Sequence, residues 1–330
     1  MKKSILSSIL PILPSWADPD IVEIRPVSQG GSVRGYYRIS SGHASTVLMD
    51  SSALPDDFKC FMSLSQKLKQ AGVPVPEVYS ALPDKCLALL EDLGDSTLYS
   101  LLKAAASKEE LTPRYEEVLK FLVRMQSASE FSLMEREFDF KGIRWETDYF
   151  FRQFIVRHCG ITPENQDELF EEFDALAERL EKVPRVFMHR DFQSQNIMVG
   201  PKGVCFIDFQ GARLGLPHYD LVSLLRDPYA GIPEGMEKHL LEFYVDLARP
   251  KEWFDEASFR EYYRLAGVQR HSQALGAFAY LSLELKKTQF LAHIRPCLEY
   301  LCRELEERDE LPRFRELARE AAGVCNFSKR

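Results

Sequence analysis

Residues 189–209, HRDFQSQNIMVGPKGVCFIDF, place polar side chains suited to catalysis beside short apolar runs. Asp191 and Asn196 lie five positions apart, and Asp208 follows twelve positions after Asn196. Carboxylate and amide oxygens are the hard ligands that Mg²⁺ prefers, and Mg²⁺ usually completes its shell with phosphate oxygens and water. Phosphoryl transfer needs little beyond such positioning and charge neutralisation. The spacing therefore favours a catalytic loop over polar residues that only cap neighbouring helices.

Two kinds of secondary structure are predicted on either side of residue 92. Short β-rich runs precede it, and the helical spacing of Phe58, Phe61 and Leu64 marks one helix among them. The predicted strands cover 21–27, 36–40, 45–50 and 86–92, the helix covers 56–72, and 73–79 forms an extended connector. Later helices are predicted over 96–106, 113–130, 145–159, 164–182, 217–228, 234–248, 255–274 and 275–305. Three very short strands interrupt them within 185–209, around the predicted loop.

This order of elements predicts an α+β fold with two lobes. A small β-rich N-terminal lobe, residues 1–92, precedes a larger helical C-terminal lobe, residues 93–330. The catalytic loop belongs to the helical lobe.

The composition is that of an ordinary globular protein, with 45% hydrophobic and 28% charged residues. A net charge of −8 argues against nucleic-acid binding, because no basic surplus is present to neutralise phosphates. No apolar run approaches the ~20 residues of a membrane span. The seven cysteines are scattered and form no CxxC pair, which indicates reduced thiols in a cytoplasmic protein.

Residues 1–17, MKKSILSSILPILPSWA, have the lysines, apolar stretch and small terminal residue of a signal peptide. Pro11 and Pro14, however, interrupt the apolar stretch. The segment is therefore predicted to form an N-terminal helix or arm that packs on the first lobe, and export is the alternative.

The chain resembles the aminoglycoside phosphotransferase-like kinases over about residues 30–280. Within that superfamily it is most similar to the anomeric sugar kinases of bacterial cell-wall recycling, which phosphorylate N-acetylmuramate and N-acetylglucosamine. The segments that carry the resemblance are GSVRGYYRI, VLMD, GVPVPEVY, LLEDLGDSTL, HRDFQSQNIMV, DFQGARLGLPHYDLVSLLRD and GVQRHSQALGAF. The resemblance implies the two-lobe protein-kinase fold, with a nucleotide-binding N-terminal lobe and a substrate pocket in the helical lobe.

The resemblance also implies roles for the catalytic loop, with ATP and Mg²⁺ as cofactors. In such loops an aspartate accepts the proton of the attacking hydroxyl, and an asparagine and a second aspartate hold Mg²⁺. These positions correspond to Asp191 as catalytic base and to Asn196 and Asp208 as metal ligands. His189 and Asp220 would support the loop, and Asp220 is also a candidate N-cap of its own helix.

The nucleotide is expected to contact a glycine-rich loop and the junction of the lobes. The residues predicted to line its site are Gly30, Gly31, Ser32, Gly35, Arg38, Glu91 and Leu93. Glycines allow the backbone to approach phosphates closely, and residues 89–94 lie where a kinase offers backbone groups to adenine.

One departure from the kinase pattern concerns the lysine of the third strand, which grips the phosphates in many kinases. Met49 stands at that position, and the helix that follows offers no obvious glutamate partner. Phosphate neutralisation would then fall to Mg²⁺ and to Arg38, the preferred substitute, or Arg34. Either arginine is equally well explained as an exposed strand cation.

Polar residues in otherwise apolar helical segments are candidates for acceptor binding. They are Arg226, Gln269, Arg270 and His271, of which the last three adjoin one another. Polar side chains in a buried helix are costly unless they are satisfied, although a solvated helix face is an equal alternative. Arg226 or Arg270 would pair with the lactyl carboxylate of the sugar, whereas Trp145, Tyr149 and Phe150 are expected in the core.

Two other functions remain open. An aminoglycoside or other small-alcohol kinase would need an acidic pocket for a polycation, and the candidate residues include arginines instead. A nucleotide-binding pseudokinase is disfavoured because Asp191, Asn196 and Asp208 are all retained. The expected partner is thus a small sugar, with no nucleic acid and no membrane, and the sequence identifies no protein partner.

Overall fold

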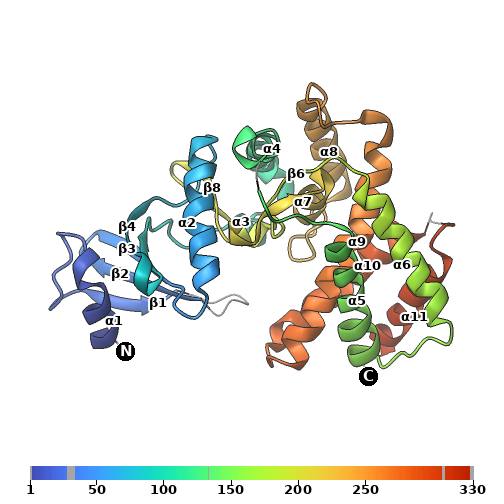
Figure 1. The fold of residues 1–330 in the computed structure, drawn as a ribbon, viewed down its shortest axis with the longest axis horizontal. Coiled ribbons are helices and arrows are strands. Elements are labelled where there is room, and N and C mark those ends of the chain that lie inside the picture. The colour runs from blue at the N-terminus through green and yellow to red at the C-terminus, as the bar shows by residue number, and fades with distance from the viewer. Residues whose placement is uncertain (1, 28–33, 133, 307–308, 328–330) are drawn as a thin grey trace. The chain divides into compact units, whose positions relative to one another are not determined.

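The computed structural model describes residues 2–27, 34–132, 134–306 and 309–327 (Figure 1). Its contacts divide the chain into two compact units. The first consists of Met1–Leu98 and Asn196–Gly211, and the second of Tyr99–Gln195 and Ala212–Arg330. The sequence-based division at residue 92 assigns 93–98 and 196–211 to the helical lobe, whereas both segments pack in the first unit.

An antiparallel five-stranded sheet organises the first unit, in the order β1-β2-β3-β5-β4. The strands are β1 (Glu23–Pro26), β2 (Gly35–Ser41), β3 (Ala44–Asp50), β4 (Val78–Leu82) and β5 (Leu87–Leu90). Gly42, with a φ of 59°, turns β2 into β3 in a conformation that suits glycine. The four predicted strands are confirmed, but the connector predicted over 73–79 runs into β4, an edge strand that begins just after Pro74 and Pro76.

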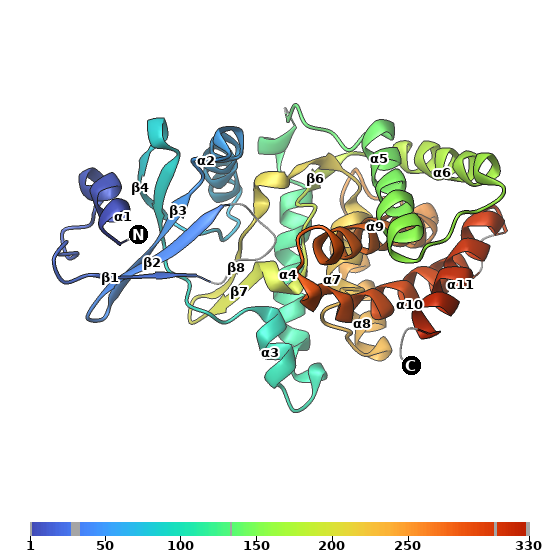
Figure 2. The same ribbon diagram turned by 90° about the horizontal axis from the view of Figure 1, so that it is seen from below.

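Two helical segments accompany this sheet, and the strands lie between them in both views (Figures 1 and 2). Helix α2, Pro55–Gln70, buries Phe58 and Phe61 at the spacing that predicted it. The N-terminal arm forms α1 (Lys2–Ile9) and a 3₁₀ turn, η1 (Leu10–Ile12). Ile9 is fully buried in a cluster with Ile39 and Leu48 of the sheet, which confirms the predicted packing of the arm.

The segment 196–211 adds a short hairpin to the first unit. Strand β7 (Ile197–Gly200) pairs antiparallel with β8 (Gly203–Phe206), and both were predicted as short strands. The amide of Phe206 donates to the Pro74 carbonyl at 2.9 Å, and that of Val199 donates to the Ser96 carbonyl at 2.8 Å. These bonds fix the hairpin to the rest of its unit.

The second unit is mainly helical. Its α-helices are α3 (Leu98–Ala104), α4 (Thr112–Gln126), α5 (Phe140–Phe150), α6 (Gln166–Glu181), α7 (Pro217–Leu225), α8 (Glu234–Ala248), α9 (Glu256–Leu283), α10 (Ile294–Leu305) and α11 (Pro312–Phe327). A π-helical segment, η5 (Phe151–His158), continues α5, and a 3₁₀ segment, η8 (Thr288–His293), precedes α10. Strand β6 (Val186–Met188) pairs antiparallel with β9 (Arg213–Gly215). Helix α11 and strand β9 were not predicted from the sequence, and α9 extends nine residues beyond the predicted end at residue 274.

Helix α9 lies among α5, α7 and α10 (Figures 1 and 2). From Leu265 to Ala279 it is buried on all sides rather than along one stripe, as expected of a helix at the centre of a bundle. Gly276 lets α5 approach, because a Cβ at this position would lie 2.8 Å from the Tyr149 ring. Polar residues on α9 must therefore find partners inside the protein.

None of the helices within the described ranges combines the length and apolar content that crossing a membrane requires.

His218, on α7, is buried and has no hydrogen-bond partner for either ring nitrogen among the described residues. Its ring packs on Phe259, with ring centroids 4.7 Å apart. Burial lowers the pKa of His218 from its ordinary 6.5 to about 3. Between these two values the unfolded chain binds a proton at this residue that the folded protein does not.

The free energy of unfolding is therefore expected to fall as the pH is lowered from 6.5, with His218 contributing about 2 kcal/mol of loss at pH 5. The substitution His218→Phe should remove this contribution, because it leaves no ring nitrogen to protonate. Urea denaturation at pH 7.5 and pH 5.0 measures the difference. His43→Asn, at an exposed position, is the control and should keep the wild-type pH dependence. If the free energy of unfolding fell equally for wild type and His218→Phe, His218 would not be the source of this pH dependence.

Candidate active site

The loop that carries Asp191 begins where β6 ends, and a buried carboxylate holds its start. Asp220, on α7, accepts hydrogen bonds from the amide of His189 at 2.6 Å and from the amide of Arg190 at 2.9 Å. Burial raises the pKa of Asp220 to about 7, although the two backbone donors oppose that rise. Arg190 adopts a φ of 78°, a left-handed conformation that costs a non-glycine residue about 1 kcal/mol or more. Asp191 follows directly and is half-buried.

A second buried carboxylate, Asp227, holds the other end of the loop. It accepts from the Ser194 amide at 2.9 Å and from the Ser194 hydroxyl, and its second oxygen accepts from the Tyr229 amide at 2.9 Å. Burial raises the pKa of Asp227, and these donors lower it in part. Asp191 is thus bracketed by two fixed points of the backbone.

Glu146 on α5 was not predicted as a site residue. Its carboxylate is 1% exposed and accepts from Tyr219 at 3.0 Å and from Gln269 at 3.2 Å. The Arg190 guanidinium lies 3.5 Å away. Burial raises the pKa of Glu146, and the Arg190 charge opposes this. In the sequence, Glu146 stands in the aromatic-rich segment WETDYFF. That setting does not identify Tyr219 and Gln269 as its partners.

The first unit holds the two predicted metal ligands at the base of the β7–β8 hairpin. Asn196 directly precedes β7, and its carbonyl accepts from the Ile207 amide at 3.1 Å. Asp208 follows Ile207 and has a φ of 65°. Phe209 is fully buried and stacks on Phe61 of α2, with ring centroids 5.0 Å apart. The strand pairing and this stack fix Asp208 on both sides.

The Asp208 carboxylate has one oxygen engaged and one available. Oδ1 accepts from Arg34 at 2.8 Å and from Gln210 at 2.6 Å, whereas no described residue donates to Oδ2. The side chain is 38% exposed. Within the described ranges, no three His, Cys, Asp or Glu side chains gather as a metal site. A carboxylate oxygen and an asparagine amide nevertheless suit Mg²⁺, which takes its remaining ligands from phosphate and water.

The structure describes some of the residues predicted to bind the nucleotide and not others. Gly30, Gly31 and Ser32 lie outside the described residues, and Gly35 begins β2. Met49 is fully buried in β3. The Glu91 carboxylate accepts from Lys202 at 2.8 Å, and Leu93 is half-buried in the segment after β5.

Arg38, the preferred substitute for the lysine, is paired with two carboxylates. Its guanidinium donates to Asp92 at 2.7 Å and to Asp95 at 2.9 Å. Burial raises the pKa of Asp92, but hydrogen bonds from Arg38, Ser45 and Gly94 outweigh it and leave the pKa lowered. Arg34, with a side chain 6% exposed, is the arginine that contacts a predicted metal ligand.

The acceptor candidates, just after α7 and on α9, each contact other residues of the second unit. Arg226 donates to Glu237 at 2.7 Å and to Glu304 at 3.0 Å, so its charge is compensated. His271 also contacts Glu304, at 2.8 Å. Gln269 donates to Glu146, and Arg270 contacts the catalytic loop at Gln193.

The expectation that Trp145, Tyr149 and Phe150 are core residues holds for Phe150 alone, which is fully buried. Trp145 is 51% exposed, and its ring stacks on that of Tyr149, one turn later in α5, with ring centroids 5.0 Å apart. Tyr149 is half-buried, and its ring faces Gly276 and Tyr280 of α9.

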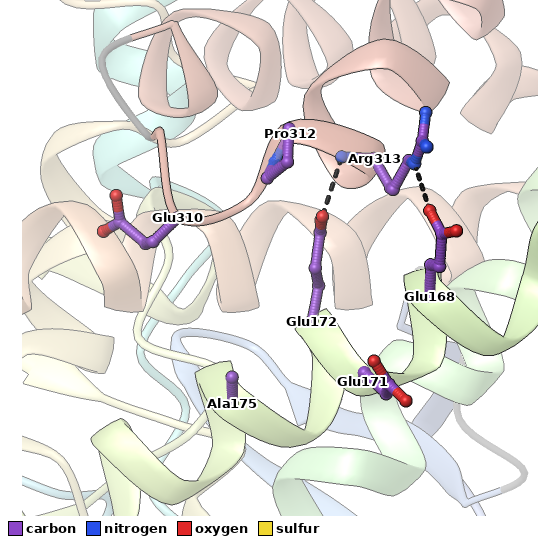
Figure 3. Close-up of a pocket in the computed structure, with 7 residues that line it drawn as sticks. All are labelled: Glu168, Glu171, Glu172, Ala175, Glu310, Pro312 and Arg313. Carbon is purple, nitrogen blue, oxygen red and sulfur yellow. Dashed lines mark hydrogen bonds and ion pairs between the residues drawn. The ribbon is translucent and has the colours of Figure 1, made fainter.

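An acidic hollow between α6 and α11 is lined by Glu168, Glu171, Glu172, Ala175, Glu310, Pro312 and Arg313 (Figure 3). Glu172 accepts from the amides of Arg313 and Phe314 at 2.8 Å each, and Arg313 pairs with Glu168 (Figure 3). These contacts cap the N-terminus of α11, so the charges here hold a helix in place.

Comparison with known proteins extends this description. The phosphotransferase enzyme family matches residues 23–262. The N-acetylmuramate/N-acetylglucosamine kinase of Pseudomonas aeruginosa is 29% identical over 322 residues, which cover 94% of this chain and 93% of that protein. The protein of the same name from Neisseria meningitidis is 32% identical over 280 residues, 82% of each chain. A solved choline/ethanolamine kinase family protein from Mesorhizobium loti shares the fold, with a TM-score of 0.63 at 13% identity, covering 97% of this chain and 99% of its own.

Replacement by methionine is expected to have different effects at Arg34, just before β2, and at Arg38, within β2. Arg34→Met should raise the KM for ATP about tenfold or more, because it frees the Asp208 oxygen that Arg34 orients. Arg38→Met should instead lower the free energy of unfolding by about 1–3 kcal/mol, because Asp92 loses its main donor. Steady-state kinetics and urea denaturation of both variants test this. A larger KM effect for Arg38→Met, with unchanged stability, would restore Arg38 as the phosphate contact.

Proposed function

Because the chain belongs to the phosphotransferase enzyme family, we propose that it transfers the γ-phosphoryl group of ATP to the anomeric hydroxyl of N-acetylmuramate or N-acetylglucosamine. The membership confirms the sequence-based assignment to the aminoglycoside phosphotransferase-like kinases, with their small antiparallel sheet and helical C-terminal part. The observation that carries the choice of sugar is the match, over most of both chains, to relatives that bear the name of this sugar kinase.

Asp191 is the proposed general base. Its carboxylate accepts the proton of the anomeric hydroxyl as the sugar oxygen attacks the γ-phosphorus, and the bond to the bridging oxygen breaks to release ADP. An anomeric hydroxyl is more acidic than an ordinary alcohol, so a carboxylate suffices for this proton. The hydrogen bonds of Asp220 and Asp227 to the loop keep the base from moving during the transfer.

Asn196 and Asp208 would hold Mg²⁺, which supplies neutralisation of the phosphate charge. Oδ2 of Asp208 is the oxygen left for that purpose, since Arg34 and Gln210 occupy Oδ1. Glu91 and Leu93, after β5, remain the proposed contacts of the adenine, and His189 and Asp220 the proposed supports of the loop.

Turnover by the purified protein tests the proposal directly. ADP release with Mg-ATP is expected with N-acetylmuramate and N-acetylglucosamine, and not with kanamycin. The product should be a sugar 1-phosphate without reducing activity, and N-acetylglucosaminitol, which has no anomeric carbon, should not be phosphorylated. Turnover of kanamycin alone would contradict the proposed sugar acceptor and indicate an aminoglycoside acceptor instead.

Asp191→Asn should lower kcat at least about a hundredfold, because an amide cannot accept the proton. Its thermal unfolding should match that of the wild type, since Asp191 is half-buried and the loop is held by other residues. Full activity in a folded Asp191→Asn variant would remove Asp191 from the mechanism.

A further inference from the structure

Arg270 is a buried cation whose hydrogen bonds all go to neutral groups. It is 6% exposed and lies in α9, the central helix of the second unit. It donates to the Ser223 hydroxyl at 2.8 Å, to Gln273 Oε1 at 2.6 Å and to Gln193 Oε1 at 3.4 Å. Arg226, by contrast, meets two carboxylates. Arg270 thus hydrogen-bonds no carboxylate among the described residues, although the charges of Asp191, Asp220 and Asp227 act on it from beyond hydrogen-bond distance.

The amides beside Arg270 have a defined orientation. Gln193 and Gln273 each turn their oxygen toward the guanidinium, so each NH₂ group lies on the other side of its amide carbon. No described residue accepts from either NH₂ group, and both side chains are half-buried rather than enclosed. Donation by Arg270 polarises the two amides, which strengthens them as donors to a further oxygen.

These residues adjoin the proposed catalytic base. Gln193 lies two positions after Asp191, and the charge of Arg270 interacts with that of Asp191. Tyr229, whose amide donates at 2.9 Å to the Asp227 carboxylate that holds Ser194, is half-buried and packs against His293 with ring centroids 4.3 Å apart. A cation, two outward amide donors and an aromatic surface thus gather near the residue that would receive the proton of the sugar.

We propose that Arg270, Gln193 and Gln273 form a subsite for the carboxylate of the lactyl group that distinguishes N-acetylmuramate from N-acetylglucosamine. The amides donate to the carboxylate oxygens, and Arg270 supplies positive charge behind them. Arg226, the other candidate for this carboxylate, is already neutralised by Glu237 and Glu304. The subsite rests on the proposed function, because it names how one of the two sugars is recognised.

The variant Gln273→Glu tests the subsite with little change of shape. A glutamate carboxylate at this position still accepts the hydrogen bond from Arg270, and its negative charge offsets the charge of the guanidinium. It also repels an incoming carboxylate. The ratio of kcat/KM for N-acetylmuramate to that for N-acetylglucosamine should fall at least about tenfold. Gln153→Glu is the matched control, because Gln153 also accepts from an arginine, Arg157, on the remote segment η5. It should leave the ratio at the wild-type value.

Calorimetric titration of each protein with either sugar, without nucleotide, supplies a readout that does not require turnover. Weaker binding of N-acetylmuramate by Gln273→Glu, by the same factor, supports the subsite. An unchanged ratio in both assays, with a folded variant and an active wild type, overturns the subsite and leaves the sugar kinase in place. Absence of binding and turnover with both sugars in the wild type overturns the proposed function and the subsite together.

Discussion

Each backbone N–H that the catalytic loop turns inward needs an acceptor, because an unmet buried donor costs as much as a lost hydrogen bond. Asp220 and Asp227 provide these acceptors from within α7 and from just beyond its end. A carboxylate accepts from several donors at once but is costly to bury, and burial raises the pKa of both residues. Because the loop is held on two sides, the left-handed conformation of Arg190 persists despite its cost.

The central position of α9 has a related consequence for its polar residues. Consecutive residues on a helix point about 100° apart, so Gln269, Arg270 and His271 face different neighbours. Gln269 reaches Glu146 on α5 and His271 reaches Glu304 on α10. Arg270 faces Ser223 on α7 and Gln193 on the loop, and it meets neutral groups there. Both ring nitrogens of His271 are engaged within the bundle, and Gln269 has its Nε2 engaged but not its buried Oε1. Arg270, which points toward the loop, is the one that hydrogen-bonds neutral groups alone.

The sequence predicted those features that local patterns determine. The spacing of Asp191, Asn196 and Asp208 marked the loop, and alternating and helical periodicities marked the strands and most helices. Features that depend on distant partners could not be derived in this way. Whether Arg34 or Arg38 serves Asp208 depends on where Asp92 lies after the sheet has formed, 54 residues beyond Arg38. Glu146 resembled any polar residue in an apolar helix until Tyr219 and Gln269 were placed beside it.

The replacement of the third-strand lysine by Met49 is consistent with the surroundings of that strand. Met49 is fully buried, and a lysine without a carboxylate partner at this depth would be destabilising. Arg34, outside β3, places positive charge beside Asp208, and its contact with Asp208 Oδ1 provides the negative partner that an internal cation needs. The same contact, together with Gln210, fixes the carboxylate so that Oδ2 remains for a metal ion. A single ion pair thereby compensates the arginine and orients the aspartate, so neither role requires a charge in the middle of β3.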